Sequence, residues 1–210
     1  PIRSLATINM VAYQGSAAAK RIFTVIDAPI KIKHEKNLPN ILIKKSDILF
    51  QDVSFKYKVS KDRAVKNINL DIAGGSITAF VGHSGAGKST IINLLPRFYD
   101  PQNGRILIDN QDISSVSLNS LRKNISLVSQ DVILFDDTVK ANIAYADANA
   151  SENEIIEACK FAAADDFIKD LPNSYNTKIG ENGVRLSGGQ KQRISIARAI
   201  LKKSPIILLD

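Results

Sequence analysis

The feature that most constrains the fold is a glycine-rich stretch, VGHSGAGKST, at residues 81–90. It stands between a short apolar run, SITAFV, and a second apolar segment, STIINLLPRF. The stretch fits the pattern G-x-x-x-x-G-K-[ST] without a gap. In such a loop the backbone N–H groups wrap around phosphate oxygens, and the following helix adds its positive N-terminal end. We therefore expect SITAFV to be a buried strand and STIINLLPRF to be a short helix.

The residue types in this loop predict a site for a nucleoside triphosphate and Mg²⁺. Lys88 would neutralise the β- and γ-phosphates, Ser89 would ligate Mg²⁺, and Thr90 would add a hydrogen bond to phosphate. His83 has no expected catalytic role, because only its backbone need touch phosphate. The positions expected to approach the phosphates through their backbone are Gly82, His83, Ser84, Gly85, Ala86 and Gly87.

The last segment, PIILLD, supplies the usual complement of such a loop. Its four apolar residues, Ile206 to Leu209, predict a central strand that brings Asp210 to the phosphates. A carboxylate at that strand end can hold Mg²⁺. Strands alternate with helices along the chain, and several strands are continuously apolar. This pattern indicates an α/β fold with a largely parallel sheet.

The chain divides into three parts by composition. Residues 1–27 have apolar residues at helical spacing, which predicts a helix. Residues 28–46 are polar, basic and bracketed by prolines, as in a linker. Residues 47–210 carry the strands, the loop and the helices of one domain. Within this domain Ser151 and Glu154 form a capping box at the start of an apolar helix.

Composition narrows the class of protein. The net charge of +7 permits phosphate, nucleic acid or a membrane surface as a partner. The basic residues are scattered and do not interleave with aromatic residues as in a base-stacking platform, so we expect no nucleic-acid partner. No run approaches the roughly 18 to 20 apolar residues that span a bilayer. The single cysteine, Cys159, lies in an apolar helical pattern and is expected to be a core residue.

A second glycine stretch, LSGGQKQR at residues 186–193, also opens a predicted helix. Ser187, Gly188 and Gly189 can therefore present N–H groups and a helix dipole to an anion. One triphosphate hardly needs two such cradles within a single subunit. The second cradle makes sense if it closes over the nucleotide bound by a partner subunit.

These motifs together resemble the ATP-binding cassette proteins. LSGGQ at 186–190, ending at Gln190, lies between GHSGAGKST and IILLD and is similar to the family signature. Tyr57 in VSFKY resembles the aromatic residue that stacks on adenine. Gln130 in LVSQD resembles the glutamine that senses Mg²⁺ and the membrane domain. The segments IGENG (179–183) and LFDDTVKANIAYA resemble the exporter form of the domain.

The resemblance implies a P-loop NTPase core with a mostly parallel sheet, an antiparallel β subdomain and a helical subdomain, incomplete at its C-terminus. It implies ATP and Mg²⁺ as cofactors, with Lys88, Gln130 and Asp210 as catalytic residues and Ser89, Gln130 and Asp210 at the metal. Two cassettes would pair head to tail, so that Ser187, Gly188, Gly189 and Gln190 of one reach the ATP of the other.

Bacterial lipid A and multidrug exporters, with the membrane domain fused ahead of the ATPase, are the most similar members. Residues 1–27 resemble the cytoplasmic end of their last transmembrane helix. The resemblance therefore implies a homodimer, the transmembrane domains of the same polypeptide and of its partner as further partners, and a place on the cytoplasmic face of the inner membrane.

The family pattern continues beyond Asp210 with a catalytic glutamate and a histidine, so we expect impaired turnover by these 210 residues and an ATPase in a longer parent. Two alternatives remain. One is a non-catalytic nucleotide-binding module, which a residue other than glutamate after Asp210 would favour. The other is a soluble cassette protein acting on nucleic acid. The interval from Gln130 to Ser187 disfavours it, because it has room only for a compact helical subdomain.

Overall fold

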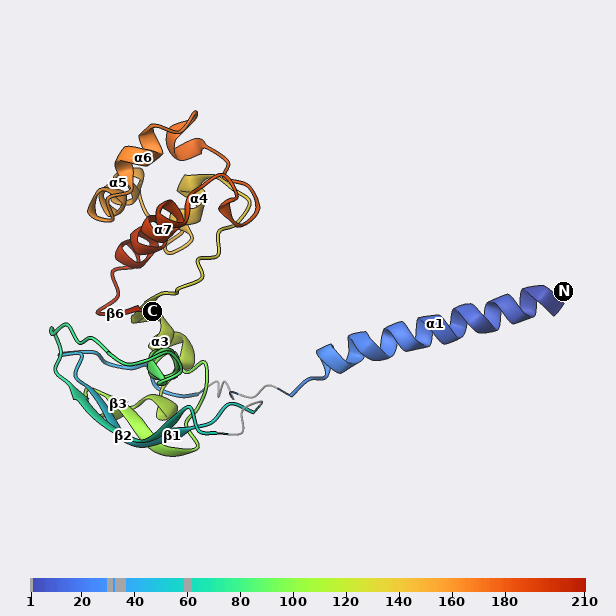
Figure 1. The fold of residues 1–210 in the computed structure, drawn as a ribbon, viewed down its shortest axis with the longest axis horizontal. Helices are drawn as coiled ribbons and strands as arrows, with labels where there is room; N and C mark the ends of the chain where they lie inside the picture. Colours follow the sequence, from blue (N-terminus) through green and yellow to red (C-terminus); the bar gives the residue numbers. More distant parts are fainter. Residues whose placement is uncertain (1, 30–31, 33–36, 59–61) are drawn as a thin grey trace. The chain divides into compact units, whose positions relative to one another are not determined.

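The computed structural model describes residues 2–29, 32, 37–58 and 62–210, and the chain forms two compact units that divide between residues 33 and 34. The first unit contains one helix, α1 (Ile2–Ile26), as the apolar spacing predicted (Figure 1). From Ile8 onward its large apolar side chains are exposed, among them Tyr13 and Val25. In the described residues, no helix combines the length and apolarity needed to cross a membrane. Part of the predicted linker, residues 30–31 and 33–36, lies outside the described residues.

The second unit begins with an antiparallel sheet of order β2-β1-β3-β4. Strands β1 (Ile48–Phe55), β2 (Val65–Ile72) and β3 (Asn103–Ile108) are followed by the short β4 (Gln111–Asp112). Phe50 lies opposite Leu70 on one side and Ile106 on the other. Alternating apolar residues of these strands form a core on one face of the sheet. This sheet is the expected antiparallel β subdomain.

A turn after β3 fastens the chain that enters this sheet. The Asp109 carboxylate accepts the backbone N–H groups of Lys44 (2.6 Å), Lys45 (3.0 Å), Ser46 (3.2 Å) and Asp47 (3.0 Å). Burial raises the pKa of Asp109, but these four bonds outweigh it, and the net pKa lies below its usual value. Asp109 therefore ties residues 44–47 to the β3–β4 turn.

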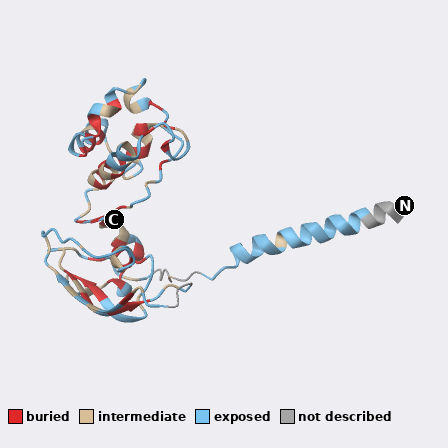
Figure 2. Cartoon of the chain, in the orientation of Figure 1, coloured by how far each residue is buried: buried red, intermediate tan, exposed pale blue. Residues whose placement is uncertain are grey.

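The expected helical subdomain follows. It is built from α4 (Val139–Ala144), α5 (Glu152–Phe161), α6 (Asp165–Lys169) and α7 (Gly188–Leu201), with 3₁₀ turns η2 (Ser174–Asn176) and η3 (Glu181–Gly183). These helices enclose a second apolar core, separate from that of the sheet (Figure 2).

Two local features of this subdomain were predicted. The capping box is present: the Ser151 hydroxyl accepts the Glu154 N–H (3.3 Å), and the Glu154 carboxylate accepts the Ser151 N–H (2.9 Å). Cys159 is fully buried in the helical core, as expected. Burial raises the pKa of its thiol to about 11, so the thiol stays protonated at neutral pH.

The parallel part of the fold consists of β5 (Ile125–Val128) and β6 (Ile206–Leu209), which pair in register from Ile125–Ile206 to Val128–Leu209. The helix α3 (Leu118–Lys123) precedes β5. Mixed α/β character is thus confirmed, although among the described residues the parallel sheet has two strands. Ser126 and Lys202 link this pair to its surroundings, through bonds to the carbonyls of Ala199 and Ile125.

Two predictions about strands were wrong. Residues 76–81, the predicted buried strand SITAFV, have no regular secondary structure, and the Ile77 side chain is fully exposed. Strand β6 is not central, because its only partner among the described residues is β5, and Ile207 and Leu209 are exposed. A buried strand needs hydrogen-bonding neighbours and covering layers, and an apolar composition alone does not provide them.

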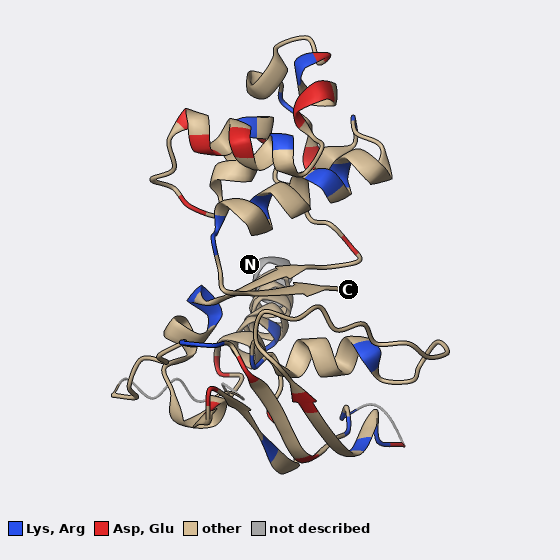
Figure 3. Cartoon of the chain, turned by 90° about the vertical axis from the view of Figure 1, so that its left-hand side faces the viewer, with Lys and Arg blue, Asp and Glu red and all other residues tan. Residues whose placement is uncertain are grey.

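Charged side chains lie on both parts of the second unit. Figure 3 shows lysines and arginines on the helices and the strands, with acidic residues among them. On the helices and in the turn after α7 several form ion pairs, including Lys169–Asp165 (2.7 Å) and Lys203–Glu154 (2.6 Å). The net positive charge is therefore spread over the surface and is partly paired.

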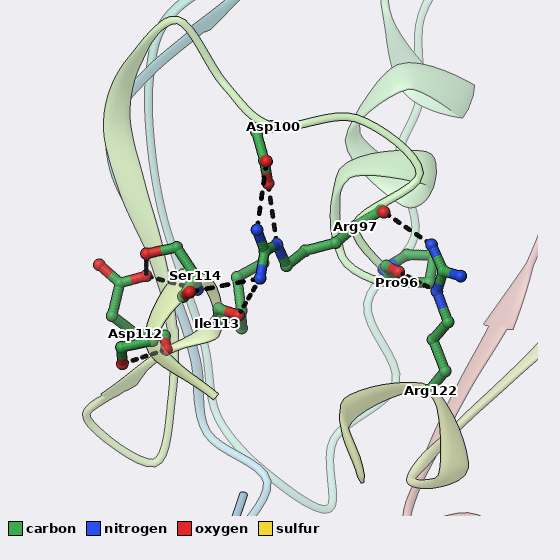
Figure 4. Close-up of polar contacts among 8 residues, drawn as sticks. Pro96, Arg97, Asp100, Asp112, Ile113, Ser114 and Arg122 are labelled. Atoms are coloured by element: carbon green, nitrogen blue, oxygen red, sulfur yellow. Dashed lines mark hydrogen bonds and ion pairs between the residues drawn. The ribbon is translucent and has the colours of Figure 1, made fainter. Parts of the chain in front are cut away.

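Two arginines form a clamp around residues 96–100 (Figure 4). The Arg97 guanidinium, which is 7% exposed, donates to both Asp100 carboxylate oxygens (2.8 and 3.2 Å) and to the Ile113 carbonyl (3.2 Å). Arg122 on α3 donates to the carbonyls of Pro96 (2.9 Å) and Arg97 (2.8 Å). This arginine clamp fixes the turn to α3 and to the 3₁₀ turn η1 (Ile113–Ser115).

Candidate functional site

The glycine loop leads directly into helix α2 (Lys88–Leu94), as its pattern predicted. Gly87 is the N-cap of this helix, with φ 92° and ψ 9° in the left-handed region. A Cβ atom at Gly87 would lie 2.5 Å from the Ala64 carbonyl oxygen. Glycine is therefore required at Gly87 for both its backbone conformation and its close packing.

The Lys88 ammonium is held over this loop. Its Nζ atom donates to the carbonyl oxygens of Gly82 and His83, at 2.9 Å each. The backbone N–H of Ala86 closes the same turn onto the His83 carbonyl (3.2 Å). The cation therefore folds back onto the glycine loop, where the residue pattern predicts that phosphate binds.

Asp210 reaches the loop from the end of β6. The Ser89 hydroxyl donates to its carboxylate at 2.7 Å, and the Asp210 N–H donates to the Val128 carbonyl at 3.0 Å. A hydroxyl beside a carboxylate offers the oxygen ligands that Mg²⁺ prefers. No group of three or more His, Cys, Asp or Glu side chains gathers in the described ranges. This donor set fits Mg²⁺, which usually takes one or two carboxylates and fills its other positions with water and phosphate.

Loop, helix and Asp210 surround a cavity of about 540 Å³. Its lining residues are Tyr57, Ala64, Ser84, Gly85, Gly87, Lys88, Ser89, Thr90, Gln130 and Asp210. All of these except Ala64 were predicted from the sequence as site residues. Ala64 was not predicted, because an alanine side chain carries no functional group that would mark it as a site residue. It lines the cavity because Gly87 packs against its carbonyl.

The second glycine stretch lies elsewhere. Ser187 is the N-cap of α7, where its hydroxyl accepts the Gln190 N–H (3.3 Å) and its own N–H donates to the Gln190 side chain (2.8 Å). Gly188 and Gly189 follow it on an exposed helix start. Within the described chain, none of these four residues lines the cavity. One chain therefore does not bring its two glycine stretches together.

A comparison with family models decides the classification. The model described as ABC transporter matches residues 65–210, which contain the glycine loop, the second glycine stretch and Asp210. The chain belongs to the ABC transporter family. The expected resemblance is thereby confirmed.

Curated relatives of this ABC domain are longer proteins. The ATP-dependent lipid A-core flippase of Syntrophus aciditrophicus is 50% identical over 213 residues, covering 100% of this chain and 35% of the relative. The protein of the same name from Legionella pneumophila strain Paris is 49% identical, with the same coverage. A solved bacterial Atm1-family ABC exporter with ATP bound has a TM-score of 0.88 and 45% identity, covering 94% of this chain and 34% of that one. The chain thus spans about a third of each.

The ABC domain also contains an aromatic contact that was not predicted from the sequence. Tyr57 donates to or accepts from the Thr90 hydroxyl (3.2 Å), and its ring packs against Phe55 and Tyr99. Tyr99 lies in the segment RFYD after α2. Its position shortly after the helix that follows the glycine loop was the one feature of the sequence that could have indicated this contact. Gln130 lies exposed after β5 and lines the cavity.

Proposed function

We propose that this chain is the ATP-binding and ATP-hydrolysing domain of an exporter that moves a lipid or another hydrophobic compound across a membrane. The Ser89–Asp210 contact of 2.7 Å carries the proposal, because it brings the glycine loop and a carboxylate that can ligate Mg²⁺ together in one cavity. The relatives support it through their names, an ATP-dependent lipid A-core flippase and an Atm1-family ABC exporter with ATP bound.

Each cavity residue has a role in this proposal. Lys88 neutralises the β- and γ-phosphates, and the loop N–H groups from Gly82 to Gly87 bind their oxygens. Ser89 and Asp210 hold Mg²⁺, with Gln130 beside them. Bound Mg²⁺ would neutralise the charge that develops on the phosphates. Tyr57 offers its ring to the adenine.

Pairing of two such domains completes the site. The start of α7 is exposed, and in the described part of the chain its residues Ser187, Gly188 and Gly189 do not line the cavity. Paired head to tail, two copies place this helix start at the γ-phosphate of the partner's nucleotide. The exposed apolar side chains of α1 suit packing against the transmembrane domains of the same polypeptide and its partner, at the cytoplasmic face of the membrane.

Ser89→Ala tests the metal part of the proposal. It is expected to weaken binding of MgATP by about tenfold, and of ATP in excess EDTA by much less, because the lost hydroxyl contacts the metal and not the phosphates. Isothermal titration calorimetry measures both affinities. Ser76→Ala is the matched control, because the Ser76 hydroxyl donates to the Ala73 carbonyl and Ser76 does not line the cavity. Equal losses with and without Mg²⁺ would refute the metal role of Ser89.

Ser187→Arg tests the pairing. Light scattering after size exclusion is expected to show a monomer without nucleotide and a dimer with MgATP for the unaltered chain. The variant is expected to stay monomeric, because a bulky cation at the helix start blocks its approach to the partner's cavity. A variant that dimerises as well as the unaltered chain would exclude the head-to-tail arrangement.

A further inference from the structure

Three aromatic rings meet beside the cavity. We call Phe55, Tyr57 and Tyr99 the aromatic triad. The Tyr57 ring is perpendicular to both others, at 86° with centroid distances of 4.8 Å to Phe55 and 5.1 Å to Tyr99. Phe55 and Tyr99 themselves lie 5.3 Å apart at 44°. Phe55 is buried, whereas Tyr99 is 42% exposed at the turn after α2.

The triad fixes the plane of the Tyr57 ring. Perpendicular packing at these distances is the favoured geometry of aromatic pairs, and two such neighbours together oppose rotation of the ring. The Tyr57 hydroxyl is also bonded to Thr90, at the start of α2. Both ends of the side chain are therefore held before any ligand binds.

The fixed ring still faces open space. Tyr57 lines the phosphate-loop cavity and also a second hollow of about 320 Å³, which Lys56, Lys58, Arg63 and Gln102 complete. A flat base that is attached to a triphosphate bound in the glycine loop can thus reach the ring. Holding the ring in advance favours stacking, because less side-chain entropy is lost when the base binds.

The arginine clamp holds the remaining member of the triad. Tyr99 stands between Arg97 and Asp100, whose ion pair closes the turn, and Arg122 bonds the carbonyls at its start. The neighbouring Phe98 points to a different partner, with the Arg122 guanidinium 5.3 Å from its ring centroid. Two adjacent aromatic residues of equal exposure, 42%, therefore have separate contacts.

We infer that Tyr99 is a positioning residue for nucleotide-base recognition, which acts by holding Tyr57 in the plane that stacks on the base. The inference rests on the proposed function, and it adds a residue that touches neither phosphate nor metal. Its effect must therefore depend on the base and not on the triphosphate.

Calorimetric titration with MgATP and with magnesium tripolyphosphate, which has no base, separates an effect on base binding from an effect on triphosphate binding. Tyr99→Leu is expected to weaken MgATP binding by about two- to tenfold, the range of one aromatic pair contact, and to leave tripolyphosphate binding unchanged. Tyr99→Phe keeps the aromatic ring, so its affinity for MgATP is expected to equal that of the unaltered chain. Phe98→Leu, the matched control, is expected to change neither affinity. Circular dichroism checks the fold of each variant.

Each other outcome has a distinct meaning. Equal losses for both ligands in Tyr99→Leu, or an equal MgATP loss in Phe98→Leu, would overturn the inference and leave the proposed function standing. Failure of Tyr99→Phe to restore affinity would also overturn it, because the ring would then not be the active feature. If the unaltered chain binds neither ligand, the proposed function fails, and the inference fails with it.

Discussion

Lys88→Ala is expected to lower the affinity of this chain for MgATP by about ten- to a hundredfold. A charge-assisted hydrogen bond contributes roughly 1.5–3 kcal/mol, and the substitution removes such contacts to phosphate. The Lys88 ammonium already lies over the loop, bonded to the carbonyls of Gly82 and His83, so little rearrangement is needed to meet the ligand. Isothermal titration calorimetry at fixed salt concentration measures the change.

Lys66→Ala is the matched control, because it removes an equal charge from an exposed position on β2 outside the cavity. Its affinity is expected to stay within about twofold of the unaltered chain, since exposed charges at a distance are screened. Similar losses in the two variants would show that the net positive charge attracts ATP, and that the loop geometry does not select it.

Arg97→Ala is expected to lower the free energy of unfolding by about 2–4 kcal/mol. The buried guanidinium makes bonds to Asp100 and to the Ile113 carbonyl, and alanine leaves these acceptors without their donor. Arg97 also has φ 52°, in the left-handed region, so the turn depends on its contacts to keep that conformation. Urea denaturation followed by circular dichroism measures the difference.

Arg105→Ala controls for the loss of an arginine as such. Arg105 is exposed on β3 and donates to the Gln51 side chain, so its removal is expected to cost no more than about 0.5 kcal/mol. Arg97→Lys is expected to recover only part of the stability, because a lysine cannot reproduce the planar fork of bonds. Equal stability of Arg97→Ala and Arg105→Ala would contradict the role of the clamp.

Features encoded by neighbouring residues were predicted well. The capping box of Ser151 and Glu154 and the start of α2 at the glycine loop depend on residues a few positions apart, and both are present. The strand predicted over residues 76–81 failed for the opposite reason. Burial of a strand depends on which distant segments pair with it, and the apolar residues of the segment do not specify those partners.

In the site, too, some features could be predicted from the sequence and others depend on tertiary contacts. Residue types and spacing predicted that Ser89 and Asp210 would share a metal, and the structure brings them to 2.7 Å although 121 positions separate them. The roles of Tyr57, Gln130 and Ser187 rest on a family pattern and remain predictions. The Tyr57–Tyr99 contact depends on side-chain orientations set by the core and the arginine clamp, so a pattern of letters could not reveal it.

Asp109 joins two segments that lie far apart in the sequence. Its carboxylate accepts four successive N–H groups at residues 44–47, so the attachment of this incoming segment to the β3–β4 turn depends on a single side chain. Loss of that carboxylate would remove the acceptor of four backbone donors at once. Neither Asp109 nor residues 44–47 line the phosphate-loop cavity, so the domain anchors the incoming chain and forms its cavity with separate residues.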